Sequence, residues 1–126
     1  MEIHELPDLL RRRDASGGPY LEFQRSVDLT SGLYVLPPGG VDDQQPHAED
    51  EIYCVLAGRA RITVGGEVAP VGPGTVVFVA AGVAHQFHDI ADELQVLVVF
   101  GPAEGSRAVG NDGRAGGRRP GGGTPG

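Results

Sequence analysis

The chain has 126 residues, a formal charge of −7 and no lysine. This length suits one domain. The acidic balance argues against a nucleic-acid-binding domain, which normally carries a basic face. The absence of lysine excludes Schiff-base chemistry on a lysine of this chain, and the single cysteine, Cys54, excludes an internal disulfide.

The N-terminal region is predicted to be neither a signal peptide nor a membrane span. Glu2, Glu5 and the arginines at 11–13 interrupt it with charge. No apolar run in the chain approaches the length of a transmembrane helix. We therefore expect a cytoplasmic protein that has no membrane partner and binds no nucleic acid.

Three regions are predicted from composition. Residues 1–19 form an N-terminal segment with one or two helical turns over Leu6–Arg13. Residues 20–102 form the folded domain. Residues 103–126 form a disordered tail, because the chain from Gly101 onward holds 10 of the 21 glycines, four arginines and three prolines. Without that stretch the remaining residues carry a formal charge of −9.

The domain reads as a series of short strands separated by turn signals. Every break except the last, residues 89–93, contains glycine or proline, and Gly65-Gly66 is a hairpin signal. The expected strands cover residues 20–27, 33–36, 51–57, 59–64, 67–71, 75–79, 84–88 and 94–100. With almost no helix, this pattern predicts an all-β sandwich or barrel.

Several of these strands are apolar on both faces, namely Ile52–Leu56, Thr75–Val79 and Val96–Phe100. A single sheet with one wet face does not require this pattern. We therefore expect one face to line a barrel interior and the other to be covered by a second layer or a second subunit, which favours a homodimer.

Candidate metal ligands lie in two places. Gln45 and His47 alternate, so in an extended segment both side chains point to one face, about 6.5–7 Å apart. Glu51 has the same parity, and His85 follows Gly82 much later in the chain. Two imidazoles and a carboxylate suit a divalent metal with open coordination positions.

The first of these places resembles the first sequence motif of the cupin family. That motif reads Gly, a spacer, His-x-His, three or four residues, Glu, six residues, Gly. Gly40, His47, Glu51 and Gly58 match it in this chain. Gln45 stands where the family has its first histidine.

The second place resembles the second cupin motif, which reads Gly, five residues, Pro-x-Gly, two residues, His, three residues, Asn. Gly74, Gly82 and His85 match it, with Ala80 in place of the proline and Asp89 in place of the asparagine. Two spaced motifs together form a specific signal. The resemblance covers residues 33–100.

The resemblance implies a jelly-roll β-barrel that holds one divalent ion, which can be Fe, Mn, Zn or Ni. His47, Glu51 and His85 are the implied ligands. Some cupins use Gln-x-His, which makes Gln45 a fourth candidate ligand. Gln44 or water are the alternatives for that position.

The implied function is that of a small metalloenzyme, dioxygenase-like or isomerase-like, acting on a small molecule at the metal. Glu51 is then a ligand and candidate base, and Tyr53, which has the same parity, brings a hydroxyl toward the site or belongs to the core. Phe87 shares parity with His85, whereas His88 faces the other way. Two alternatives remain open: a non-catalytic cupin that binds a metal or small ligand, and a barrel without metal.

Overall fold

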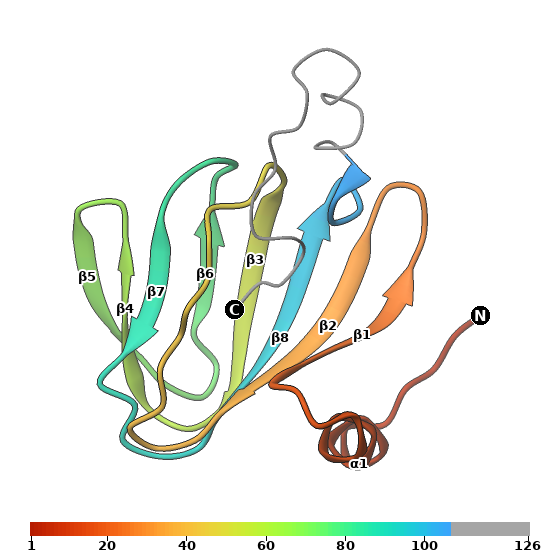
Figure 1. Cartoon of the computed structure of the whole chain (residues 1–126), viewed down its shortest axis with the longest axis horizontal. Helices are drawn as coiled ribbons and strands as arrows, with labels where there is room; N and C mark the ends of the chain where they lie inside the picture. Colours follow the sequence, from red (N-terminus) through yellow and green to blue (C-terminus); the bar gives the residue numbers. More distant parts are fainter. Residues whose placement is uncertain (107–126) are drawn as a thin grey trace.

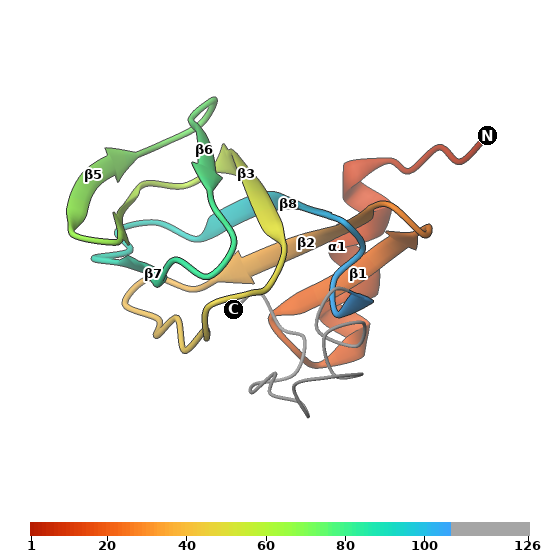
Figure 2. The ribbon, with the colours of Figure 1, turned by 90° about the horizontal axis from the view of Figure 1, so that it is seen from above.

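Two antiparallel sheets face each other and enclose the hydrophobic core in the computed structural model, which describes residues 1–106 (Figures 1 and 2). One sheet has five strands in the order β1-β2-β8-β3-β6, and the other has three in the order β5-β4-β7. The elements are α1 (Leu6–Ser16), β1 (Tyr20–Arg25), β2 (Thr30–Leu36), β3 (Asp50–Ala57), β4 (Ala60–Val64), β5 (Glu67–Val71), β6 (Val76–Val79), β7 (His85–His88) and β8 (Leu94–Gly101). The predicted all-β fold is confirmed, as is the number of strands in the described part of the chain.

Side chains along each strand alternate between the inside and the outside of the barrel, and the inward rows form its interior. In β8, Leu94, Val96, Val98 and Phe100 are fully buried, while the residues between them are partly exposed. β8 lies between β2 and β3, so its inner row contacts the inner rows of both neighbours. Because the side-chain period of a strand is two, the same alternation places every second residue of β3 inside the barrel.

The helix α1 covers one half of the outer face of the larger sheet. It lies against β1 and β2 (Figures 1 and 2), where Leu9 packs on Leu33 and Val35. The helix is longer than predicted, because residues 14–16 continue it. It ends where Gly17 adopts a φ of 82°, a left-handed conformation that glycine adopts easily. Among the described residues, no helix is long and apolar enough to cross a membrane.

The other half of this outer face is uncovered in the single chain. Four apolar side chains lie there on β3 and β6 and form what we call the apolar outer patch: Ile52, Leu56, Val76 and Phe78. Phe78 is 60% exposed and Val76 is 64% exposed. The double-sided apolar pattern of the sequence therefore reflects a barrel interior on one side and an open apolar surface on the other.

The first residues of the predicted tail belong to the folded domain. Ala103 and Glu104 are buried, with 2% and 5% of their surface exposed. The Glu104 amide donates a hydrogen bond to Thr30 Oγ1, and the Gly105 amide donates one to Glu49 Oε2. These hydrogen bonds connect residues distant in sequence, so the amino-acid composition of the tail could not predict them. The rest of the predicted tail, residues 107–126, lies outside the described residues.

Candidate metal centre

Glu51 enters the barrel from the inner row of β3. Its neighbours in register are Phe100 on β8 and Val79 on β6, both buried. Alternation places Glu51 in the same row as Tyr53 and Val55, and only 1% of its surface is exposed. A buried carboxylate is costly unless a cation or hydrogen-bond donors compensate its charge.

His47 lies in the long connection between β2 and β3 and is 3% exposed. Its ring packs edge-on against Phe100, with 4.8 Å between ring centroids. Its carbonyl accepts a 2.7 Å hydrogen bond from the Gly82 amide. This bond joins the two segments that carry the predicted ligands.

His85 begins β7 and is also buried. Its Nδ1 lies 2.8 Å from the carbonyl oxygen of Val83. Because a carbonyl only accepts hydrogen bonds, Nδ1 carries a proton, and in the neutral ring Nε2 keeps its lone pair. That Nε2 lies 3.1 Å from Glu51 Oε1.

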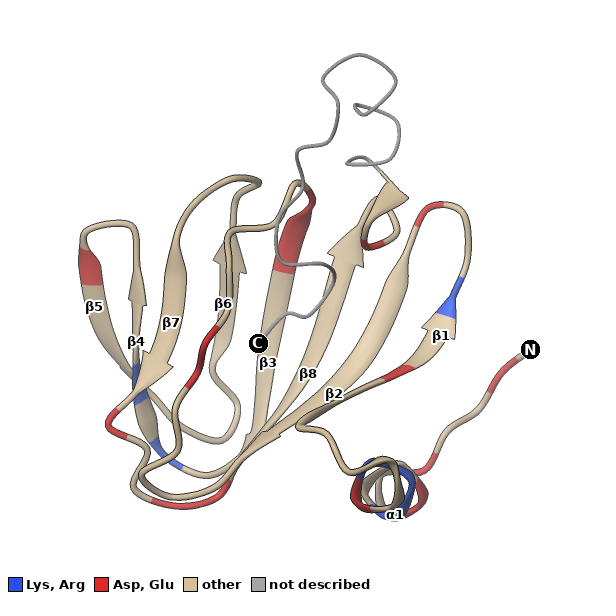
Figure 3. Cartoon of the chain, viewed as in Figure 1, with Lys and Arg blue, Asp and Glu red and all other residues tan. Residues whose placement is uncertain are grey.

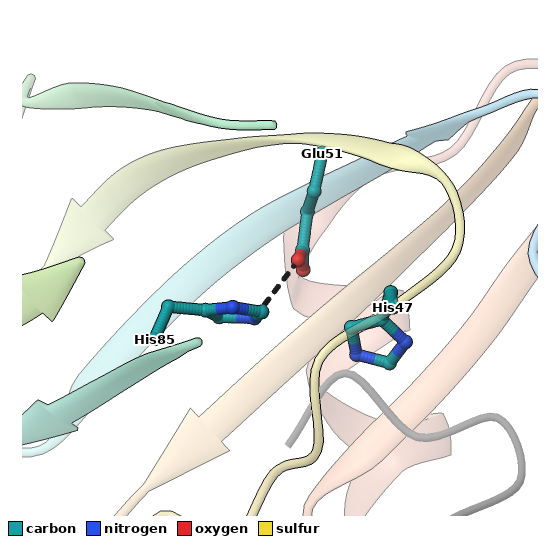
Figure 4. A group of neighbouring side chains, drawn as sticks. All are labelled: His47, Glu51 and His85. Atoms are coloured by element: carbon teal, nitrogen blue, oxygen red, sulfur yellow. Dashed lines mark ion pairs between the residues drawn. The ribbon is translucent and has the colours of Figure 1, made fainter. Parts of the chain in front are cut away.

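The three side chains converge (Figure 4). One donor atom from each of His47, Glu51 and His85 lies within 4.8 Å of the other two. Some point therefore lies within about 2.8 Å of all three atoms, close to the 2.0–2.2 Å typical of metal bonds to nitrogen and oxygen. Small side-chain movements therefore suffice to ligate one ion. Two imidazoles and one carboxylate fit a divalent first-row metal.

Burial and mutual contact shift both members of the His85–Glu51 pair. Burial raises the pKa of Glu51 above its usual range, and the neighbouring imidazole of His85 opposes this in part. Burial acts to lower the pKa of His85, but the adjacent Glu51 carboxylate outweighs that effect and the pKa is raised. The pair therefore retains a proton more readily than isolated side chains do.

Gln45 differs from His47, Glu51 and His85 in its exposure. Its side chain is exposed, and the glutamine that lies among the buried polar groups is Gln44. The alternation that paired Gln45 with His47 assumed a strand, but residues 40–47 have no regular secondary structure. Side-chain direction follows a period of two only where the backbone is extended throughout.

Tyr53 belongs to a hydrogen-bonded network beside the site. Its hydroxyl donates to Gln44 Oε1 at 2.9 Å, and Gln44 Nε2 donates to Asp42. Asp42 also accepts from the Tyr34 hydroxyl at 2.5 Å and from the Phe87 amide at 2.7 Å. Burial raises the pKa of Asp42, although these hydrogen bonds oppose the shift.

Asp42 was not recognised from the sequence. It is 1% exposed and links the connection before β3 to β7. Only its position within the spacer of the first motif could have drawn attention to it. Glu104 was missed too, because it lies in the predicted tail. Its Oε2 is 3.9 Å from Nδ1 of His47, and both side chains are buried.

The remaining predictions concerned neighbours of His85. Phe87 is buried, and its ring lies 4.9 Å from that of Tyr53. His88 faces the other side of the sheet, as its parity predicted, and its Nε2 lies 2.8 Å from Thr63 Oγ1. His88 is therefore separate from the group formed by His47, Glu51 and His85.

Comparison with known proteins identifies the family. Residues 32–100, more than half of the chain, match the cupin domain family Cupin_2. The chain is a member of the cupin family. The match includes His47, Glu51 and His85, so the buried donors of this cupin lie within the matched domain and not in an added segment.

Three proteins illustrate what this cupin is similar to. The uncharacterised protein SCO3923 of Streptomyces coelicolor is 51% identical over 104 residues, which are 82% of this chain and 99% of that protein. The β-D-galactosidase Rv1717 of Mycobacterium tuberculosis is 32% identical over 78 residues, 62% of this chain and 67% of that protein. The crystal structure of TT1209 from Thermus thermophilus has a TM-score of 0.69 and 30% identity, over 81% of this chain and 98% of that one.

A hollow of about 330 Å³ lies beside His85 in this cupin. Its lining includes Gln44, Thr63, His85 and Gln86, and no arginine of the described chain lines it. Thr63 and Gln86 are paired in register and, like His88, belong to the face of the sheet opposite His85. The described arginines lie on α1, at the end of β1 and around the start of β4 (Figure 3). The hollow therefore has amide and hydroxyl groups in its lining, whereas the side chain of His85 is only 1% exposed. The described residues add no fixed positive charge.

Proposed function

We propose that this protein is a metal-dependent cupin, in which His47, Glu51 and His85 hold one divalent ion that binds a small molecule at its open coordination positions. The convergence of three buried donor atoms carries this proposal. Iron, manganese, zinc and nickel are all compatible with two imidazoles and a carboxylate.

The metal would supply Lewis-acid chemistry, polarising a carbonyl or hydroxyl group of the bound molecule or lowering the pKa of bound water. Burial raises the pKa of Glu51 in the metal-free protein, which makes this carboxylate a better proton acceptor than an exposed one. Burial also raises the pKa of Tyr53, so its hydroxyl stays protonated and can donate a hydrogen bond. These roles fit an isomerase-like or dioxygenase-like enzyme.

We propose a neutral, hydroxyl-rich small molecule as the substrate class. The hollow beside His85 is lined by Gln44, Thr63 and Gln86, whose amide and hydroxyl groups hydrogen-bond hydroxyl groups without requiring a charge. A bound molecule would share these groups with their partners in the protein, which are Tyr53, Asp42 and His88. The similarity to a protein named as a β-D-galactosidase agrees with a sugar-like molecule. A strongly acidic body also disfavours anionic substrates.

Elemental analysis of the untagged protein tests the metal. We expect near-stoichiometric metal in the wild type and its loss in His85→Ala. The matched control is His88→Ala, which removes an imidazole three residues away on the other face of the same sheet. If none of the three proteins holds metal after loading with Fe(II), Mn(II), Ni(II) and Zn(II), the proposal fails.

A non-catalytic binding cupin is the second candidate, because the same buried donors would serve a protein that only holds a ligand. Incubation of the metal-loaded protein with a panel of sugars and polyols separates the two. Conversion or oxygen uptake that is lost in His85→Ala supports the enzyme. Metal-dependent binding without any change in the ligand supports the binding module.

A further inference from the structure

Glu104 is a buried carboxylate that is held rigidly at one end of the barrel. Its amide donates to Thr30 Oγ1 at 3.1 Å, and its carbonyl accepts from Arg25 at 3.1 Å. The next amide, that of Gly105, donates to Glu49 Oε2 at 3.0 Å. Three hydrogen bonds to distant parts of the chain therefore fix the backbone on either side of this side chain.

The carboxylate of Glu104 points to His47. Its Oε2 lies 3.9 Å from Nδ1, and the two side chains are 4% and 3% exposed. At that distance the contact is a charge interaction and not a direct hydrogen bond. Little water screens it, because both groups are buried. The charge of Glu104 also adds to burial in raising the pKa of Tyr20, which agrees with a carboxylate directed into the barrel end.

The two nitrogens of an imidazole ring point in different directions, so a group that engages one determines where the other points. His85 already shows this arrangement: Nδ1 contacts the carbonyl of Val83, and Nε2 faces Glu51. His47 has the same requirement, and the carboxylate of Glu104 lies on the Nδ1 side of its ring, at 3.9 Å. Carboxylates that orient a metal-ligating histidine in this way are a general feature of metal sites.

We propose that Glu104 is a positioning residue of the metal centre, which engages Nδ1 of His47 and so directs Nε2 toward Glu51 and His85. This inference rests on the proposed metal site. It also assigns a function to residues 103–106, because the hydrogen bonds of this short segment bring a carboxylate to a ligand that lies almost sixty residues earlier in the chain.

The test measures Co(II) binding to the wild type and to Glu104→Ala, Glu104→Gln and Thr30→Val. Thr30→Val removes the hydrogen bond to the Glu104 amide but leaves the carboxylate intact. It therefore controls for a purely structural effect of loosening the segment. We expect Glu104→Ala to weaken Co(II) binding about 10–100-fold. Glu104→Gln should restore part of the loss, because its amide oxygen can still face Nδ1 although it carries no charge. Thr30→Val should change the affinity less than either.

A second readout does not need metal. In nitrogen-15 NMR of the metal-free protein, we expect His47 to carry its proton on Nδ1 in the wild type and Thr30→Val, and to lose that preference in Glu104→Ala. Equal Co(II) affinity in the wild type and Glu104→Ala would overturn the inference. So would an equal loss in Glu104→Ala and Thr30→Val. If the wild type binds no Co(II), the proposed metal site fails, and the tautomer of His47 still decides whether Glu104 positions the ring.

Discussion

His85 Nε2 lies 3.1 Å from Glu51 Oε1, although the two side chains come from β7 and β3, which belong to different sheets. Each is almost fully buried. The barrel therefore brings together, across its interior, two groups of opposite charge when His85 is protonated. The same two groups are candidate metal ligands when it is not.

This relationship predicts opposite pH dependence with and without metal. The pKa values of Glu51 and His85 are both raised above their usual 4.5 and 6.5. Each group binds more protons in the folded metal-free protein than in the unfolded chain, from its usual pKa up to its raised pKa. The stability of the metal-free protein therefore falls as the pH rises from 4.5 through the raised pKa of His85. Metal requires deprotonated ligands, so stabilisation by metal grows over the same range.

Thermal unfolding from about pH 5 to pH 8, with chelator or with Zn(II), measures both slopes. Glu51→Gln should flatten the metal-free slope, because it removes one of the two titrating partners. A metal-free Tm that rises across this range would contradict the prediction.

The two adjacent glutamines should behave differently. Gln44→Ala removes partners from the Tyr53 hydroxyl and from Asp42, both buried, and we expect it to lower the free energy of unfolding by about 1–3 kcal/mol. Gln45→Ala removes an exposed side chain and should change stability by less than about 0.5 kcal/mol. Metal affinity should stay within about twofold of wild type in Gln45→Ala. A tenfold loss there would mean that Gln45 does ligate the metal.

Asp42 is predicted to be the main structural acid of the barrel. Asp42→Ala leaves the buried Tyr34 hydroxyl and the Phe87 amide without their acceptor, so we expect a loss of about 2–5 kcal/mol in urea unfolding. Asp43→Ala, one residue on and exposed, is the matched control and should be nearly neutral. Similar unfolding midpoints for the two variants would show that Asp42 has no such role.

The apolar outer patch leads us to propose a homodimer. A groove adjoins this patch and shares Ile52 and Phe78 with it, and a second copy would bury both. Its other lining residues are Leu29, Asp50, Glu51, Val99 and Gly101. Val76→Glu places a charge on the patch, whereas Val68→Glu places one on an exposed valine of β5 in the other sheet. We expect a dimer by light scattering for the wild type and Val68→Glu, and a monomer for Val76→Glu. A monomeric wild type at micromolar concentration would refute the dimer.

Local patterns were enough to predict the strands and most of the candidate ligands. Alternation of apolar residues, broken by glycine and proline, predicted every described strand to within a few residues, because each depends on neighbours along the chain. His47, Glu51 and His85 were recognisable because ligand types at fixed spacing beside glycine turns form a motif that needs no knowledge of distant contacts. The family followed from the same residues.

Only the tertiary structure decided the contacts between segments far apart in sequence. Gln44 and not Gln45 joins the buried network. Residues 40–47 are not a strand, and Asp42 within them is hydrogen-bonded to Gln86 and Phe87 of β7. Glu104 reaches His47 only because Thr30 and Glu49 bind the segment after β8. Sequence periodicity describes one element at a time, whereas burial of a polar group depends on which other elements surround it.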